Sequence, residues 1–158
     1  MGIRLAAEGD ENAIASVLEQ AFSEHRSLYT EAAYAATVGS PEAVRGRMTE
    51  GPIWVAIQNE EVVGTVSAVL RVESVYVRGM AVLPSARGRR IGELLLDQAV
   101  AYAARHGRTS LVLSTTPFLA RAIQLYRRFG FRWSDEGPGD LFGTPLGTMV
   151  KDLSGRPG

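Results

Sequence analysis

The sequence predicts one α/β domain with a mixed, mostly antiparallel sheet of about seven strands flanked by helices. β-Branched apolar runs gather between residues 53 and 83, whereas the segments before and after them repeat their apolar residues at helical spacing. The predicted order is one strand, several helices, three strands, then helix, strand, helix and two strands, which is an α/β arrangement. The length of 158 residues favours a single domain. A chain of this size buries roughly 70% of its unfolded surface without needing disulfides or metals.

The first third of the chain predicts a short strand and then helices. The strand is expected over residues 3–6, and the helices over 11–22, 29–38 and 41–49. Pro41 suits the first position of the third helix, where a missing N–H costs nothing. The stretch 22–34 mixes aromatic residues with two Glu and His25. We expect this stretch to be irregular in part.

The rest of the chain predicts alternating strands and helices. Strands are expected over 53–57, 62–70, 72–83, 111–113, 131–133 and 146–151, and helices over 89–105 and 117–129. Gly79 inside a strand predicts either a bulge or a close approach of another backbone. Pro84 ends that strand, and Pro117 is expected to open the last helix, which Gly130 closes. The domain is expected over 1–153, with a disordered tail over 154–158.

The composition excludes several classes of function. The chain has no cysteine and two distant histidines, which excludes a thiol nucleophile or a thiolate zinc site and argues against any metal site. Seventeen basic residues balance seventeen acidic ones, whereas a nucleic-acid-binding protein would show a basic excess. No apolar run reaches the roughly 18 residues of a membrane span, and no signal peptide is apparent. We therefore expect a cytoplasmic protein.

The segment 82–92 predicts an anion-binding site. Arg87, Arg89 and Arg90 stand at the predicted start of a helix, where the free N–H groups and the helix dipole already disfavour positive charge. A bound anion reverses that penalty, and Gly88 and Gly92 leave room for its approach to the backbone. A pyrophosphate is the natural occupant. The alternative is a solvated, arginine-rich helix start paired with nearby carboxylates.

Two motifs resemble the GNAT superfamily of N-acetyltransferases. In that family a strand ending in Val-Leu-Pro leads into Arg/Gln-x-x-Gly-x-Gly/Ala, and Arg87 and Gly92 match the outer positions of this motif. Arg90 stands where the family usually has Gly. The second motif, Ala-x-x-Leu-Tyr-x-x-x-Gly-Phe, matches residues 122–131, although Leu119 replaces the Asn that often precedes it. The motifs and the element order together cover nearly the whole chain.

The resemblance implies transfer of an acetyl group from acetyl-CoA to a primary amine by direct attack, without a covalent enzyme intermediate. It also implies that the central strands, 75–83 and 110–114, splay apart to admit the pantetheine arm. A backbone N–H near Met80 would polarise the thioester carbonyl. The residues expected to bind acetyl-CoA are Met80, Ala81, Val82, Arg87, Gly88, Arg89, Arg90, Ile91, Gly92, Ser114 and Thr115.

Tyr126 is the predicted catalytic residue, as the hydrogen-bond donor or acid for the departing thiolate. The alternative is that Tyr126 only packs in the core beside Leu125 and Phe129. No general base is identifiable. Glu24 and His25 are candidates, but solvated loop positions are the favoured interpretation for both.

The acceptor amine is not determined by the sequence. Arg78, if it points inward, favours an acceptor that bears a carboxylate, whereas Asp135, Glu136 and Asp140 favour a cationic amine. Two alternatives to an enzyme stay open: a non-catalytic acyl-CoA sensor of the same fold, and an unrelated nucleotide-binding α/β domain. A homodimer is also possible.

Overall fold

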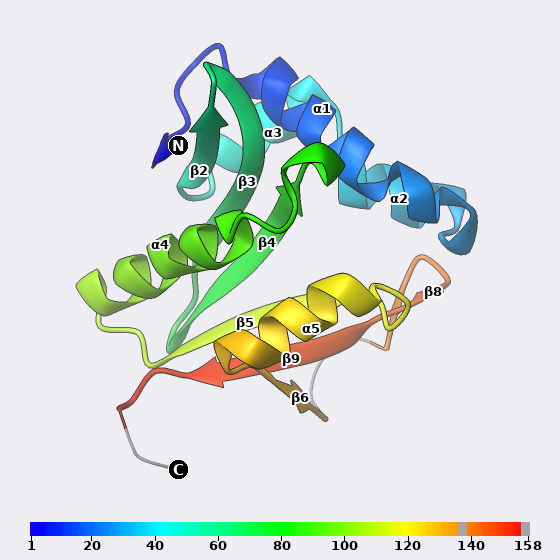
Figure 1. The fold of residues 1–158 in the computed structure, drawn as a ribbon. Helices are drawn as coiled ribbons and strands as arrows, with labels where there is room; N and C mark the ends of the chain where they lie inside the picture. Colours follow the sequence, from blue (N-terminus) through cyan, green and yellow to red (C-terminus); the bar gives the residue numbers. More distant parts are fainter. Residues whose placement is uncertain (136–138, 156–158) are drawn as a thin grey trace.

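The computed structural model describes residues 1–135 and 139–155. Its helices and strands follow the predicted order, with two short strands, 140–141 and 144–145, added in a segment that was predicted as a loop (Figure 1). The strands are β1 (Gly2–Leu5), β2 (Ile53–Gln58), β3 (Glu61–Leu70), β4 (Ser74–Val82), β5 (Ser110–Thr115), β6 (Arg132–Ser134), β7 (Asp140–Leu141), β8 (Thr144–Pro145) and β9 (Gly147–Asp152). The helices are α1 (Glu11–Phe22), α2 (Glu31–Val38), α3 (Pro41–Met48), α4 (Ile91–Arg105) and α5 (Ala120–Phe129), with short 3₁₀ helices at Ser23–Leu28 and Pro84–Ala86. Residues 156–158 of the predicted tail lie outside the described residues.

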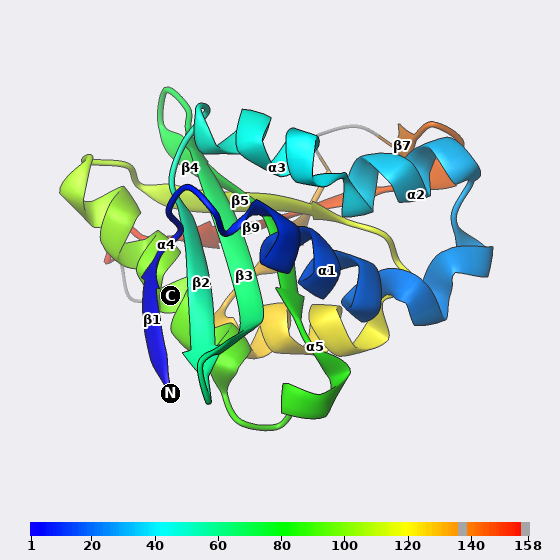
Figure 2. The ribbon, with the colours of Figure 1, turned by 90° about the horizontal axis from the view of Figure 1, so that it is seen from above.

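The main sheet has seven strands in the order β1-β2-β3-β4-β5-β9-β6. Neighbouring strands are antiparallel except for β4 and β5, which are parallel. Helices α1, α2 and α3 cover one face, whereas α4 and α5 cover the other (Figure 1, Figure 2). The predicted mixed, mostly antiparallel sheet is confirmed.

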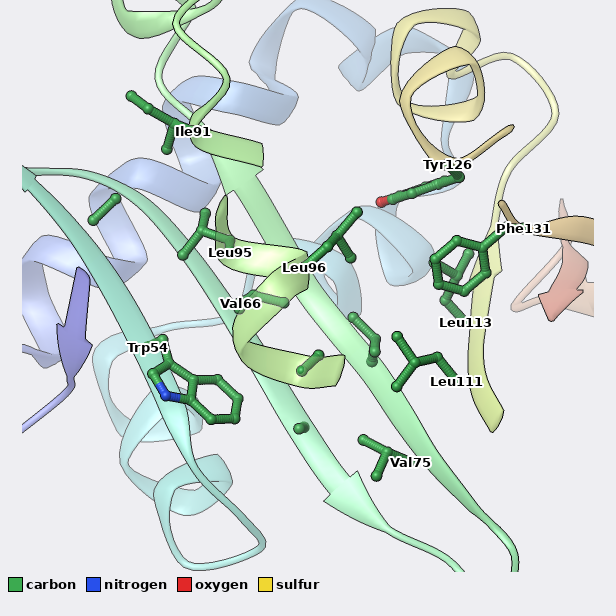
Figure 3. Close-up of a cluster of buried hydrophobic side chains, with 14 of the residues drawn as sticks. Trp54, Val66, Val75, Ile91, Leu95, Leu96, Leu111, Leu113, Tyr126 and Phe131 are labelled. Atoms are coloured by element: carbon green, nitrogen blue, oxygen red, sulfur yellow. The ribbon is translucent and has the colours of Figure 1, made fainter. Parts of the chain in front are cut away.

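Each face of the sheet carries its own hydrophobic core, because side chains alternate along every strand. On β2, Ile53 and Val55 belong to the cluster under α1, α2 and α3, while Trp54 lies in the cluster under α4 (Figure 3). Leu95 and Leu96 of α4 are fully buried there. The helical spacing of apolar residues in the sequence thus marked the faces that pack on the sheet.

The parallel strands β4 and β5 separate before their ends. Their pairing runs from Ser74 with Ser110 to Val77 with Leu113, yet β4 continues to Val82 and β5 to Thr115. A bulge follows immediately on β4, since its register with β3 shifts at Gly79, whose φ is +59°. The predicted splay is confirmed, and of the two alternatives for Gly79 the structure shows the bulge.

Two helix starts differ from the sequence prediction. Helix α5 begins at Ala120 rather than at Pro117, because residues 116–119 form a turn in which the Leu119 N–H donates to the Thr116 carbonyl at 3.1 Å. Phe118 in this turn packs edge-on against Tyr29, with ring centroids 4.9 Å apart. Helix α4 begins at 91 rather than 89, since the residue before it is left-handed.

Candidate active site

A groove of about 1000 Å³ opens where β4 leaves β5. It runs from the N-terminus of α4 to the end of β4, with α5 along one side and the end of α1 along the other. Its lining includes Phe22, Glu24, His25, Met80, Ala81, Val82, Arg87, Gly88, Arg90, Ile91, Gly92, Phe118, Arg121, Gln124, Leu125, Tyr126 and Arg128. The groove therefore joins the two sequence motifs.

Most of the predicted binding residues line this groove, but three do not. Arg89 lies outside it and donates from Nη1 to the Gln58 side-chain oxygen at 2.6 Å. Ser114 and Thr115 are paired with Thr148 and Gly147 of β9 and are absent from the groove lining. The geometry thus brings together the end of β4, the helix start and Tyr126, but not the end of β5.

The start of α4 presents free backbone donors to the groove. The first helical hydrogen bond runs from Leu94 N–H to the Arg90 carbonyl at 3.1 Å, and among the described residues no N–H from 88 to 93 donates to a backbone carbonyl. Gly88 and Arg90 both have positive φ, +83° and +62°, which bends the chain around this point. Open N–H groups at the positive end of a 15-residue helix fit a phosphate group.

The backbone conformation at Arg90 accounts for the preference of the family motif for Gly at this position. Its φ of +62° and ψ of +17° are left-handed, a conformation that Gly adopts without the steric cost that a Cβ imposes. Its guanidinium is exposed and pairs with Glu93 at 3.0 Å. Arg90 therefore carries a steric cost in this conformation that Gly would not carry.

Two of the three arginines of the loop, Arg87 and Arg90, are paired with carboxylates, as the alternative interpretation expected, whereas Arg89 bonds to an amide oxygen. Arg87 Nη2 lies 2.9 Å from Glu24 Oε1, and this contact holds the pKa of the Glu24 carboxyl below its usual value. The arginines by themselves therefore do not identify an anion site. The free N–H groups beside them are what makes the loop a candidate for one, and Glu24 is half exposed, so that a more highly charged anion can compete with it for Arg87.

Gly92 is required by packing as well as by access. A Cβ at this position would lie 2.7 Å from Leu125 Cδ2 and 3.1 Å from Met80 Cε. Both of these side chains line the groove. The absence of a side chain at Gly92 thus allows α4, α5 and β4 to approach one another at the groove.

Tyr126 lies at the meeting point of groove and core. Its side chain is 7% exposed and packs edge-on against Phe131, with centroids 5.7 Å apart. Its hydroxyl points away from Phe131, toward the side of Leu96 (Figure 3). This hydroxyl has no hydrogen bond among the described residues, and burial raises its pKa. The ring fits the core interpretation and the free hydroxyl fits the catalytic one, so the two roles are compatible.

The candidate general bases occupy the opposite wall. His25 Nε2 lies 3.5 Å from Glu24 Oε1, and its ring faces Phe118 at 6.1 Å. Because Glu24 is engaged by Arg87, its carboxylate is a weaker base than an unpaired one. His25 keeps an exposed edge in the groove.

The groove wall formed by α5 was not predicted from the sequence. Arg121, Gln124 and Arg128 recur at helical spacing and line the groove, whereas Ile123 is buried. The polar side of this amphipathic helix was the signal that could have identified them.

Within the described residues, no group of three or more His, Cys, Asp or Glu side chains could hold a metal ion. No described helix is long and apolar enough to cross a membrane.

Comparison with known proteins agrees with this geometry. The sequence model of the acetyltransferase (GNAT) family matches residues 13–131, so the chain belongs to the GNAT acetyltransferase family. It is 37% identical over 100 residues to an IAA acetyltransferase of Azospirillum brasilense, covering 61% of this chain and 64% of that one. The chain spans 36 to 64% of the length of the curated relatives it matches.

Solved structures show the same fold. A ribosomal-protein-alanine N-acetyltransferase of Brucella melitensis superposes with a TM-score of 0.75 at 26% identity, covering 97% of this chain and 100% of that one. The PaiA N-acetyltransferase of Thermoplasma acidophilum, solved with coenzyme A, has a TM-score of 0.80 at 15% identity, covering 96% and 99%.

Proposed function

We propose that this protein is an N-acetyltransferase that moves an acetyl group from acetyl-CoA to a primary amine. The observation that carries the proposal is the continuous groove between the open start of α4 and the splay of β4 from β5. The family and its CoA-bound structural neighbour support the same assignment. The N–H groups of residues 88–93 and Arg87 would hold the pyrophosphate, and the segment 80–82 would line the pantetheine arm.

Acetyl-CoA supplies an activated thioester, whose carbonyl carbon the amine nitrogen attacks directly. The C–N bond forms, the C–S bond breaks, and the amine loses a proton while the thiolate of CoA gains one. Without a cysteine in the chain, an acyl-thiol intermediate on the protein is excluded.

Tyr126 is the proposed donor to the leaving sulfur. Its hydroxyl has no described protein partner, so it is free to donate to a thiolate at the end of the groove. Since burial raises its pKa, Tyr126 stays protonated at neutral pH and acts first as a hydrogen-bond donor. A hydrogen bond to a charged group contributes about 1.5–3 kcal/mol, enough to assist expulsion.

The proposal is tested by measuring CoA release from acetyl-CoA over a panel of primary amines, together with the shift of the thermal midpoint by acetyl-CoA, ATP and NAD. We expect stabilisation by acetyl-CoA and turnover of at least one amine. Stabilisation by acetyl-CoA without turnover of any amine would identify a sensor module instead. Stabilisation by ATP or NAD but not by acetyl-CoA would refute the GNAT assignment of the groove.

The cellular location and the oligomeric state remain predictions. We propose a cytoplasmic protein, and sedimentation equilibrium of the full chain decides between a monomer and a homodimer.

A further inference from the structure

Two arginines from different elements meet on the face of the sheet covered by α3. Arg78 extends from β4 and forms an ion pair with Glu50, just after α3. Arg47, in the last turn of α3, donates from Nη2 to the Ala36 carbonyl at 3.0 Å. We refer to Arg47, Arg78 and Glu50 as the arginine cluster.

The arginine cluster lies against the bulge at which β4 enters the groove. A Cβ at Gly79 would be 3.6 Å from Arg47 Nη1 and 3.5 Å from Ser67 Oγ. The next residue, Met80, already lines the groove. The guanidinium of Arg47 therefore lies beside Gly79, the residue that precedes the segment 80–82. It is on the face of the sheet opposite to α4 and α5.

The two guanidinium groups of the arginine cluster have more hydrogen-bond donors and more positive charge than the neighbouring acceptors and carboxylates balance. Among the described residues, Arg78 pairs with one carboxylate, and Arg47 has no carboxylate within ion-pair distance. Arg78 Nε is buried without a hydrogen-bond partner there. Burial and the neighbouring Arg78 lower the pKa of Arg47, which is the signature of crowded, partly desolvated positive charge. A buried donor without an acceptor costs free energy, which a ligand acceptor would recover.

A carboxylate is the group that suits these donors. Its two oxygens accept from a guanidinium in a planar, bidentate arrangement, and its charge balances the second arginine. In an α-amino acid the carboxylate and the amine are separated by one carbon. Binding of the carboxylate by Arg47 and Arg78 would thus hold the amine close to the bulge.

We infer that the acceptor is an amine that bears a carboxylate, such as a free amino acid, and that Arg47 and Arg78 bind that carboxylate. This inference rests on the proposed function. Of the carboxylates in the acidic loop, Asp140 Oδ1 accepts from Gly143 N–H at 3.0 Å within the β7–β8 turn, and Asp135 is exposed. Glu136 lies outside the described residues.

The test compares each of the twenty L-amino acids with its carboxamide in the CoA-release assay. We expect kcat/KM for the best amino acid to exceed that of its carboxamide by at least about tenfold, as one lost charge-assisted hydrogen bond predicts. Arg47→Gln and Arg78→Gln should each reduce this preference to about twofold, mainly through KM. Arg45→Gln, on the exposed side of α3, is the matched control and should preserve the preference.

Calorimetric titration of the CoA-saturated protein provides a readout without turnover. The best amino acid should bind to the wild type and to Arg45→Gln, and at least about tenfold more weakly to Arg47→Gln and Arg78→Gln. Equal kcat/KM for acid and carboxamide, or an undiminished preference in both arginine variants, would overturn the inference. If no amine is turned over, the proposed function fails, and calorimetry then decides alone: equal binding of acid and carboxamide refutes the carboxylate site.

Discussion

Replacing Tyr126 by Phe removes one oxygen atom and little else. The ring packs against Phe131, and these contacts survive the change. The hydroxyl has no described hydrogen-bond partner, so its removal leaves no protein group unpaired. We therefore expect the free energy of unfolding at neutral pH to change by less than about 1 kcal/mol.

The effect on catalysis should be much larger than the effect on stability. A hydrogen bond from the phenol to the departing thiolate contributes about 1.5–3 kcal/mol, and 1.36 kcal/mol corresponds to a tenfold change in rate. The kcat of Tyr126→Phe should thus fall by roughly 10- to 150-fold. Affinity for acetyl-CoA should change by less than about threefold, since the bond forms mainly in the transition state.

Steady-state CoA release gives kcat, single-turnover mixing shows that chemistry limits the rate, and calorimetry gives the affinity for acetyl-CoA. Tyr102→Phe is the matched control, because Tyr102 packs on Trp54 of the same core outside the groove lining. An unchanged kcat with chemistry rate-limiting would refute Tyr126 as the donor. A loss of stability as large as the loss of activity would assign it to packing alone.

Three further predictions follow from the groove and its loop. Arg90→Gly should raise the free energy of unfolding, measured by denaturant titration, by about 0.5–1 kcal/mol. The substitution relieves roughly 1–2 kcal/mol of left-handed backbone strain and adds only about 0.5–1 kcal/mol of chain entropy to the unfolded state. A loss of stability would show that the ion pair of Arg90 with Glu93 matters more than the strain. Arg87→Gln should weaken acetyl-CoA binding about tenfold at low salt and flatten its salt dependence, measured by calorimetry, whereas equal affinity would exclude Arg87 from the phosphate site. Because burial raises the pKa of Tyr126, the folded state keeps a proton that the unfolded chain releases near pH 10, so its contribution to stability is complete below about pH 10 and is lost as the pH rises further. Above that pH, Tyr126→Phe should lose stability less steeply than the wild type, and parallel curves would contradict the shift.

The sequence was sufficient for the fold because local signals and tertiary packing agree along most of the chain. The apolar spacing of α1 and α4 marked their buried faces, and Gly79 marked the bulge. Pro117 misled, since the contact of Phe118 with Tyr29, far away in sequence, holds a turn where proline alone favours a helix start.

The candidate site was predictable only where it follows a continuous motif. Residues 80–82 and 87–92 could be assigned from one stretch of chain, and most of them line the groove. The pairing of Arg87 with Glu24 and the approach of Arg47 to the bulge depend on the docking of the N-terminal helices, which no local pattern encodes. The left-handed Arg90 was equally hidden, because arginine carries no signal for that conformation.

The short pairing of β4 with β5 divides the sheet mechanically. Four residue pairs join the block β1-β2-β3-β4 to the block β5-β9-β6, and beyond Val77 no strand pairing connects the two blocks within the described residues. Since the Leu83 N–H donates to the Val63 carbonyl, strand alternation turns the amide of Val82 toward the gap. A pantetheine arm that accepts a hydrogen bond from the Val82 amide would connect the two blocks of the sheet at the gap. We expect acetyl-CoA to slow hydrogen exchange at this amide and to narrow the range of angles between the blocks.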